Sequence, residues 1–366
     1  MNVTFITDPL VTSAGSVRPA FLLARAFRKE GHSVTITSTQ FAEQLVEVLS
    51  SEGITIKKAI SGHSLRCSFP TLGAWGGCLL WLREADRSFE SDFVVNTSSC
   101  IISKCHVYYA QGPMTRTLSD IMLRKHSLPA YVYHMLEKPA TFREKELIRR
   151  FRELARSFVA NSRFCAAMYE EWGIPVDGII NPPMDCSFFK SSTTSPTRDY
   201  VLTTTGVYGK EGSANVIRMV ADAGVRIKIF GNVLTIPASL TNHPNIDILG
   251  RVTDLELVDL YSNALFTLFA FAHEPFGYIP VESMACGTPV LTYRRQGPCE
   301  TVVQKQTGWL VDSDKDLRNL AVAIWKDGYA ETVNSACVKR ASEFDITRIS
   351  SKWLKLAKST VGDQRH

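Results

Sequence analysis

The sequence predicts an α/β fold made of two doubly wound domains. Short segments rich in β-branched residues, such as Val3–Thr7 and Val34–Thr37, alternate with amphipathic helical patterns. This alternation is typical of parallel sheets covered by helices. It restarts at Tyr200–Thr205, after a small and polar stretch (residues 190–198) that has the composition of a linker. A chain of 366 residues is also long enough for two domains.

The first half of the chain shows a repeated strand–helix pattern. Strands are predicted at residues 3–7, 34–37, 93–96, 106–110, 158–160 and 178–180, and helices at 16–27, 41–49, 142–158 and 164–172. Gly15 lies between the first strand and the first helix, where backbone N–H groups can approach a ligand. An ordinary turn explains a single glycine equally well. We expect residues 1–185 to form the N-terminal domain.

The second half repeats the pattern. Strands are predicted at residues 200–205, 227–231, 246–250, 265–270 and 289–293, and helices at 213–223, 254–262 and 280–286. Thr253 should cap the second of these helices. Residues 186–345 would form the C-terminal domain. A last helix at about 346–358 carries Trp353, and the segment 346–366 would pack back onto the first half.

One stretch of the second half, Glu274–Val290, combines groups that recognise different parts of one ligand. Glu274 and Glu282 are separated by seven residues, and a Pro-Phe-Gly turn follows the first of them. A short helix is expected from about Pro280, because proline suits the first helical position. The N-terminus of a helix attracts phosphate, and carboxylates accept hydrogen bonds from hydroxyls. The stretch therefore predicts a nucleotide-sugar site.

The same stretch resembles the donor-site signature of the retaining family 4 glycosyltransferases, which have GT-B architecture. Glu274-Pro275-Phe276-Gly277 and the run from Glu282 to Val290 carry the signature. Residues 245–254 before it, and the segments 296–300 and 308–311 after it, match the family as well. The resemblance implies two Rossmann-like domains that face a cleft. The N-terminal domain would bind the acceptor, and the C-terminal domain would bind the nucleotide-sugar donor.

The resemblance also implies roles for individual residues. Glu282 would hold the ribose hydroxyls of the nucleotide, although a helix-capping glutamate explains the same position. Glu274 would contact hydroxyls of the transferred sugar, near the reacting carbon. The other donor-binding positions would be the backbone N–H groups of Phe276, Gly277 and Tyr278 at the diphosphate, Arg251 and Val252 beside the base, Lys210 at the leaving phosphate, and the loop at Gly15.

Two positions depart from the pattern of the family. Val207 stands where the family usually has an arginine, so one phosphate cation has to come from elsewhere, with Arg251 and Arg18 as candidates. Gln111 stands at the end of a strand where the family often has a histidine. Its side chain could bond a sugar hydroxyl but could not act as an acid or base. The implied mechanism is front-face displacement with retention, in which the leaving phosphate helps to deprotonate the acceptor.

The sequence gives no reason to expect a metal ion or a bound cofactor. Asp312-Ser313-Asp314 resembles a metal-binding Asp-x-Asp motif, but it precedes an apolar-periodic helix and is better explained as a helix cap. The nine cysteines include no Cys-x2-Cys pair, which argues against a zinc site or a disulfide framework. The nucleotide sugar would serve as co-substrate.

Positive charge is concentrated between residues 104 and 163, which hold 12 Lys/Arg against 5 Asp/Glu. No nucleic-acid recognition motif accompanies it, so we expect an anionic membrane surface or an anionic acceptor as the partner, and no nucleic acid. A cluster at Trp75 and Leu79–Leu82 is a second candidate for lipid contact, with ordinary packing as the alternative.

The expected location is the cytoplasm, peripheral on the inner face of the membrane. No apolar run reaches the length of about 18–20 residues that spans a bilayer. The first residues are uncharged and β-like and do not resemble a signal peptide.

Together these features predict a transferase that moves a hexose from a nucleotide sugar to a lipid-linked acceptor or a growing glycan. One alternative is a GT-B sugar-nucleotide epimerase, which would need acid–base groups that face the sugar from the first half. Another is a non-catalytic nucleotide-sugar-binding subunit, which the altered positions Val207 and Gln111 would permit. The base, the sugar, the acceptor and the oligomeric state do not follow from the sequence.

Overall fold

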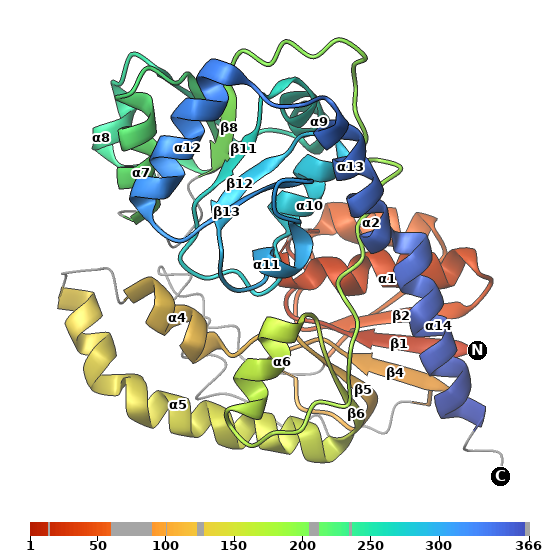
Figure 1. Cartoon of the computed structure of the whole chain (residues 1–366). Helices are drawn as coiled ribbons and strands as arrows, with labels where there is room; N and C mark the ends of the chain where they lie inside the picture. The colour runs from red at the N-terminus through yellow and green to blue at the C-terminus, as the bar shows by residue number, and fades with distance from the viewer. Residues whose placement is uncertain are drawn as a thin grey trace. The chain divides into compact units, whose positions relative to one another are not determined.

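The computed structural model describes residues 1–13, 15–59, 90–99, 101–122, 128–204, 212–233 and 236–362. Val207, Lys210 and the cluster at residues 75–82 lie outside these ranges. The chain forms two compact units, each built around one parallel sheet (Figure 1). Unit 1 comprises Met1–Thr117, His134–Pro183 and Ile346–His366, and unit 2 comprises Leu118–Tyr133 and Met184–Asp345. The predicted α/β class with two doubly wound sheets is confirmed.

The described part of unit 1 contains a seven-stranded sheet in the order β3-β2-β1-β4-β5-β6-β7. Its strands are β1 (Asn2–Ile6), β2 (Ser33–Ser38), β3 (Thr55–Lys58), β4 (Phe93–Asn96), β5 (Cys105–Ala110), β6 (Ala155–Ala160) and β7 (Gly178–Ile179). The helical elements are η1 (Gly15–Val17), α1 (Arg18–Lys29), α2 (Glu43–Ser51), α5 (Leu128–Leu154), α6 (Arg163–Glu170) and α14 (Ile346–Gly362). All neighbouring strands pair in parallel. The central strands are almost wholly buried, as expected for a parallel sheet with both faces covered.

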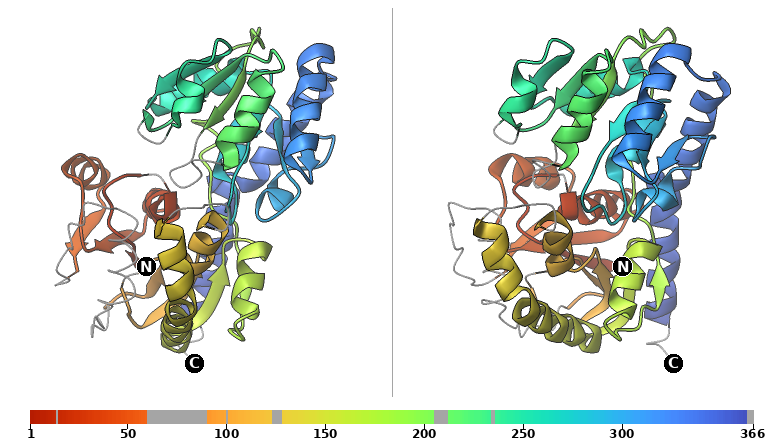
Figure 2. Two further views of the ribbon diagram at one scale, coloured as in Figure 1. Left: turned by 90° about the vertical axis from the view of Figure 1, so that its left-hand side faces the viewer. Right: turned by 60° about the vertical axis from the view of Figure 1, so that its left-hand side comes forward.

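The last helix, α14, belongs to the core of unit 1. It packs along α1, and Figure 2 shows it beside the sheet in both views. Trp353 is fully buried, and its ring meets the ring of Tyr109 edge to face with 5.1 Å between centroids. The Tyr109 hydroxyl in turn donates a hydrogen bond to the carbonyl of Ile180 at 2.8 Å. The two ends of the chain thus share one core.

The described part of unit 2 contains a six-stranded sheet in the order β10-β9-β8-β11-β12-β13. Its strands are β8 (Val201–Thr204), β9 (Ile227–Phe230), β10 (Ile246–Gly250), β11 (Thr267–Phe269), β12 (Val290–Tyr293) and β13 (Gly308–Val311). The helical elements are α7 (Gly212–Ala221), α8 (Ala238–Thr241), α9 (Asp254–Asn263), α10 (Tyr278–Ala285), α11 (Pro298–Thr301), α12 (Asp314–Asp327), α13 (Thr332–Ala341) and η3 (Ser342–Phe344). Thr253 caps α9 as predicted, through a capping box with Glu256.

The strand order reverses once in each sheet. The reversal lies between β1 and β4 in unit 1 and between β8 and β11 in unit 2. Open parallel sheets bind ligands beyond the carboxyl ends of their strands at such a switch point. In unit 2 the segment after β11 leads directly to Glu274. In unit 1 the segments after β1 and β4 carry Asp8 and Thr97–Ser99.

Helices α4 (Met114–Met122) and α5 differ from the prediction. The sequence predicted a helix at residues 142–158, but α5 begins at Leu128 and ends at Leu154, where β6 follows. Pro139 lies inside α5, and Figure 2 shows that the helix bends along its length. Residues Leu118–Tyr133 belong to unit 2, whereas the sequence analysis assigned all of residues 1–185 to the N-terminal domain. Hydrogen bonds of Asp120 to His273 and Gln296 tie this segment to unit 2.

Candidate active site

The turn after β11 folds a carboxylate onto its own backbone. Gly277, just before α10, has φ 101° and ψ 67°, a left-handed conformation that glycine adopts without steric cost. This conformation brings the backbone N–H of Gly277 to 3.0 Å from Oε1 of Glu274, and the N–H of Phe276 lies 3.4 Å from the same oxygen. The Glu274 side chain therefore accepts hydrogen bonds at the N-terminal end of α10, where the helix dipole favours negative charge.

Burial controls the acidity of Glu274. Removal of the carboxyl group from water raises its pKa, because a charged carboxylate is poorly solvated in the interior. The N–H groups of Gly277 and Phe276 and the neighbouring His273 act in the opposite direction, while the negative charge of Glu282 adds to the increase. Burial is the larger of these opposing effects, so the pKa of Glu274 is raised.

The second carboxylate, Glu282, lies on the buried face of α10. Its side chain is part of the interior of unit 2, and its Oε2 accepts a hydrogen bond from the hydroxyl of Tyr261 at 3.1 Å. Tyr261 projects from α9 and is itself fully buried. The structure therefore brings Glu274, Glu282 and the N-terminus of α10 together at one switch point.

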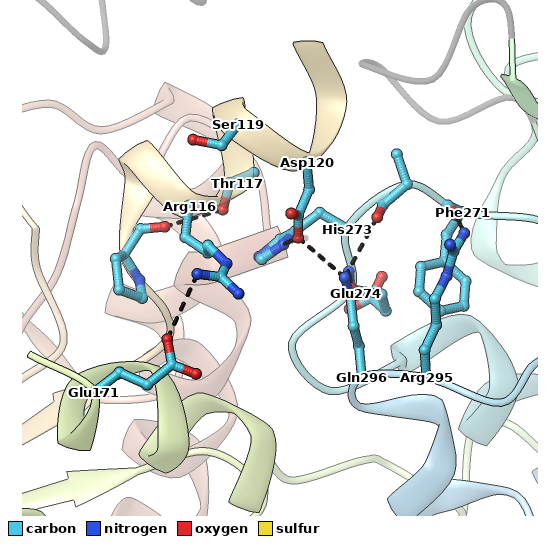
Figure 3. Close-up of polar contacts among 12 residues, drawn as sticks. Arg116, Thr117, Ser119, Asp120, Glu171, Phe271, His273, Glu274, Arg295 and Gln296 are labelled. Carbon is cyan, nitrogen blue, oxygen red and sulfur yellow. Dashed lines mark hydrogen bonds and ion pairs between the residues drawn. The ribbon is translucent and has the colours of Figure 1, made fainter. Parts of the chain in front are cut away.

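Three residues that the sequence analysis did not assign to the site hold the Glu274 turn. Oε1 of Gln296 accepts a hydrogen bond from the backbone N–H of Glu274 at 2.6 Å. Nε2 of Gln296 donates to Oδ2 of Asp120 at 3.0 Å, and Nδ1 of His273 lies 2.8 Å from the same oxygen. Figure 3 shows Asp120, His273 and Gln296 grouped around Glu274. Asp120 is distant in sequence from the motif, so no local pattern could have identified it.

Residues of unit 1 gather at the other switch point. Gly15 has φ +70° at the start of η1, so the turn requires the conformational freedom of glycine. Nε2 of Gln111 donates to the carbonyl of Ser16 at 2.8 Å and lies 3.4 Å from the carbonyl of Thr97. Gln111 thereby joins the ends of β4 and β5 to the loop at Gly15.

Asp8 forms the centre of a polar group at the same edge of unit 1. Its Oδ1 accepts hydrogen bonds from the hydroxyl of Ser98 at 2.7 Å and from the backbone N–H of Ser99 at 2.9 Å. Asp8 follows β1, and the serines follow β4, so this network spans the switch point. The sequence analysis missed Asp8, although its position after the first strand was a usable signal.

Two expected donor-binding residues lie farther along the sheet of unit 2. Arg251 and Val252 follow the edge strand β10; Arg251 is exposed, and Val252 packs against the core. Three strand spacings separate β10 from β11, which is a distance of about 14 Å. Lys210 lies outside the described residues. The structure thus groups Glu274, Phe276, Gly277, Tyr278 and Glu282 closely. Arg251 and Val252 also lie beyond the carboxyl end of a strand of this sheet, but three strands away from the Glu274 turn.

The described residues contain no group of three or more His, Cys, Asp or Glu side chains arranged to hold a metal ion. In the Asp312-Ser313-Asp314 segment, Ser313 is the N-cap of α12 and accepts a hydrogen bond from the N–H of Asp316. Asp314 accepts a hydrogen bond from the hydroxyl of Tyr293 at 2.6 Å. Asp312 lies 3.5 Å from Arg294. These contacts are those of a capped helix start.

Residues 225–327 match the family model of the glycosyl transferases, group 1. The matched stretch runs from β9 to α12 and includes Glu274, Glu282 and Gln296. The resemblance seen in the sequence is thus confirmed at the level of this group of glycosyltransferases.

Curated relatives match part of the chain. A probable transglycosylase of Burkholderia thailandensis is 28% identical over 163 residues, which are 43% of this chain and 44% of that protein. The alpha-1,3/1,6-mannosyltransferase alg-2 of Neurospora crassa is 34% identical over 131 residues, which are 35% of this chain and 26% of that protein. Each match therefore spans less than half of the relative.

The likeness in fold extends over the whole chain. The crystal structure of Anabaena HepE in complex with UDP and glucose is similar with a TM-score of 0.67, over 98% of this chain and all of that chain, at 16% sequence identity. At this identity the comparison concerns the fold, which is that of two parallel sheets with helices. In the described ranges of this chain, no helix has both the length and the apolar character needed to cross a membrane.

Proposed function

We propose that the protein is a retaining family 4 glycosyltransferase that transfers a hexose from a nucleotide sugar to a lipid-linked acceptor or a growing glycan. The observation that carries the proposal is the grouping of Glu274, Glu282 and the N-terminus of α10 at the switch point of unit 2. The group 1 match covers this grouping, a curated relative is a mannosyltransferase, and a protein of similar fold was crystallised with UDP and glucose.

In the proposed complex, each part of the donor meets a different group of unit 2. Glu282 accepts hydrogen bonds from the ribose hydroxyls. The backbone N–H groups of Phe276, Gly277 and Tyr278 bind the diphosphate, because the helix dipole and the N–H groups at a helix start favour an anion there. Two of these N–H groups donate to Glu274 in the present structure, so the Glu274 carboxylate has to turn toward the sugar hydroxyls when the diphosphate binds.

The proposed reaction breaks the bond between the anomeric carbon and the phosphate oxygen and forms a bond to the acceptor oxygen on the same face. The departing phosphate oxygen takes the proton of the acceptor hydroxyl, which leaves the nucleoside diphosphate and the new glycoside. Negative charge grows on the leaving group, and fixed N–H groups and cations stabilise it. We assign this role to the start of α10 and to Lys210, with neither a metal ion nor a further cofactor, and keep Arg251 and Val252 beside the base.

Unit 1 is proposed to bind the acceptor. Its switch point offers the amide of Gln111, the loop at Gly15 and the polar group around Asp8. Amides, carboxylates and serine hydroxyls are suited to hydrogen bonds with a hydroxyl-rich acceptor. Gln111 would hold a hydroxyl group by hydrogen bonds rather than transfer its proton.

Loss of the Glu282 carboxylate should weaken donor binding. We expect Glu282→Ala to lower the affinity for the matching nucleoside diphosphate by about 1–3 kcal/mol, the value of hydrogen bonds to a charged group, or roughly 5- to 150-fold in Kd. Isothermal calorimetry with UDP, GDP and ADP measures this loss and identifies the preferred base. Tyr261→Phe is the control, because it removes one hydrogen bond of Glu282 and keeps the carboxylate. Equal affinity of Glu282→Ala and wild type would contradict the ribose assignment.

Helix α5 supports a peripheral site of action at an anionic membrane surface, on the inner face of the membrane. Apolar side chains on it are exposed, among them Met135 at 77% and Phe142 at 68%. They lie seven residues apart and so share one face of the helix. The same stretch of the helix carries the basic residues Lys138, Arg143, Lys145, Arg149 and Arg150, of which Arg149 pairs with Glu146. Interfacial helices combine an apolar face with basic flanks in this way.

Two charge substitutions on α5 should prevent binding to anionic lipid. We expect wild-type protein to sediment with phosphatidylglycerol-containing liposomes at low salt and to dissociate as salt rises, because surface electrostatics are screened. Met135→Glu combined with Phe142→Glu should reduce the bound fraction at least several-fold. Leu255→Glu, at a 72% exposed position on α9, is the matched control. Unchanged binding of the α5 variant would remove α5 as the membrane contact.

A further inference from the structure

Gln296 has an unusual backbone conformation. Its φ is 56°, in the left-handed region where the Cβ atom of any residue other than glycine crowds the backbone. Such a conformation persists only where surrounding contacts fix it, and it is found preferentially at functional sites. The side-chain contacts of Gln296 therefore need a functional or structural explanation.

Gln296 and Gly297 together hold both backbone polar groups of Glu274. Oε1 of Gln296 accepts the Glu274 N–H at 2.6 Å, and the N–H of Gly297 donates to the Glu274 carbonyl at 3.0 Å. With its N–H and carbonyl both fixed, the peptide plane on either side of Glu274 has little freedom. The direction of the Cα–Cβ bond of Glu274 is fixed as a consequence, while the carboxylate can still turn about the side-chain bonds.

Asp120 strengthens one orientation of the Gln296 amide, which the carbonyl of Ala272, 3.4 Å from Nε2, also favours. A side-chain amide can turn over and exchange its oxygen and nitrogen, but an ionised carboxylate only accepts hydrogen bonds. Oδ2 of Asp120 therefore requires Nε2 of Gln296, at 3.0 Å, and leaves Oε1 for Glu274. The same oxygen lies 2.8 Å from Nδ1 of His273, the residue that precedes Glu274 (Figure 3).

We propose that Gln296 is a positioning residue for Glu274 and that Asp120 acts with it by favouring this amide orientation. The inference rests on the proposed function, since it assigns the two residues to the transfer step. Neither side chain contacts the donor in this account. Both act through the backbone of Glu274, and a small displacement of a reacting group is enough to lower a rate by orders of magnitude.

Gln296→Gly separates positioning from folding. Glycine adopts a φ of 56° without strain, which offsets part of the stability lost with the side-chain hydrogen bonds, so we expect the protein to remain folded with only a small decrease in unfolding temperature. We expect kcat for sugar transfer to fall about 10- to 100-fold, with KM for the nucleotide sugar changed less than about threefold. A purely structural Gln296 would give an active enzyme with altered stability only, and wild-type kcat in this variant would overturn the inference.

Exchange of the two polar partners provides a rescue test. Asp120→Asn alone replaces the charged acceptor of Nε2 of Gln296 by an amide and so weakens the preference for this orientation, and Gln296→Glu alone places a second carboxylate against Asp120. In the double variant, the introduced amide can donate to the introduced carboxylate, which still accepts the Glu274 N–H. We expect each single variant to lose at least fivefold in kcat and the double variant to recover most of that loss. Additive losses in the double variant would contradict the role of Asp120.

Gln304 supplies a matched control. Its Oε1 accepts the backbone N–H of Leu310 at 2.6 Å, the same type and length of contact that Gln296 makes, but away from Glu274. Gln304→Ala should lower the unfolding temperature and leave kcat within about twofold of the wild type. If the wild-type protein turns over no nucleotide sugar, the proposed function fails. If it turns over a donor and Gln296→Gly is equally fast, only the positioning role fails.

Discussion

Glu274→Ala is expected to reduce sugar transfer at least about 100-fold and, at the same time, to raise the affinity for the nucleoside diphosphate. The loss follows from removal of the carboxylate that would hold the transferred sugar beside the leaving group. The gain follows from the present hydrogen bonds of Glu274, which accepts from the N–H groups of Gly277 and Phe276. The diphosphate needs the same N–H groups.

The increase in affinity of Glu274→Ala for the nucleoside diphosphate can be estimated from the hydrogen bonds that are lost. Without the carboxylate, the diphosphate no longer has to displace hydrogen bonds, each of which has a net value of about 0.5–1.5 kcal/mol. A negative charge that burial already disfavours also disappears, as the raised pKa of Glu274 indicates. We therefore expect a roughly 3- to 10-fold lower Kd for the diphosphate, measured by calorimetry.

Glu274→Gln is the control that keeps the size and shape of the side chain and removes its charge. The amide oxygen can still accept the Gly277 N–H, but it carries no charge, so the increase in diphosphate affinity should be smaller than for alanine. Transfer should remain low in both variants. Retained turnover of Glu274→Ala would show that Glu274 is not part of the reaction, and weaker diphosphate binding would show that its carboxylate does not compete with phosphate.

Gly297→Ala is expected to destabilise unit 2 and to disrupt the Glu274 turn. A Cβ at this position would lie 2.5 Å from Cα and N of Phe276 and from the carbonyl carbon of Pro275. These are backbone atoms, which cannot move aside as a flexible side chain can. Gly297 has φ −55° and ψ −40°, which any residue adopts, so the requirement for glycine comes from the close approach alone.

The expected loss for Gly297→Ala is about 3 kcal/mol or more, at the upper end for overpacking, or a decrease of roughly 6–12 °C in unfolding temperature. Scanning calorimetry measures it. Gly178→Ala is the matched control, since a Cβ there meets no atom within 4 Å and its φ is not in the left-handed region. Equal unfolding temperatures of the Gly297 and Gly178 variants would contradict the close packing against the Glu274 turn.

The sequence predicted the elements that position the donor site because their signals are local. The capping box at Thr253 and Glu256 and the apolar strands before the Glu274 turn can all be read from short windows. The burial of Trp353 could be predicted in part, because a last helix with an apolar face has to pack against another surface, but its partner Tyr109 could not.

Other features depend on contacts between distant residues or on backbone angles. Nothing in the sequence near Asp120 indicates its hydrogen bonds to Gln296 and His273. The left-handed conformation of Gln296 could not be predicted from the sequence, because glutamine is not a residue typical of turns. The apolar periodicity predicted a helix only from residue 142, whereas α5 begins at Leu128 and contains Pro139, which a sequence pattern marks as unfavourable inside a helix. The Glu274 carboxylate was expected to point to a sugar, whereas it caps its own turn in this structure.

The most direct test of the account is consumption of a labelled nucleotide sugar. UDP-, GDP- and ADP-linked hexoses labelled in the sugar are incubated with the wild-type protein and Glu274→Ala, and the release of nucleoside diphosphate is followed together with the anomeric configuration of the product. The account predicts that the wild type consumes one donor with retention and that Glu274→Ala binds its diphosphate but does not consume the donor. Absence of both binding and turnover for every donor, or consumption at equal rates by the two proteins, would contradict it.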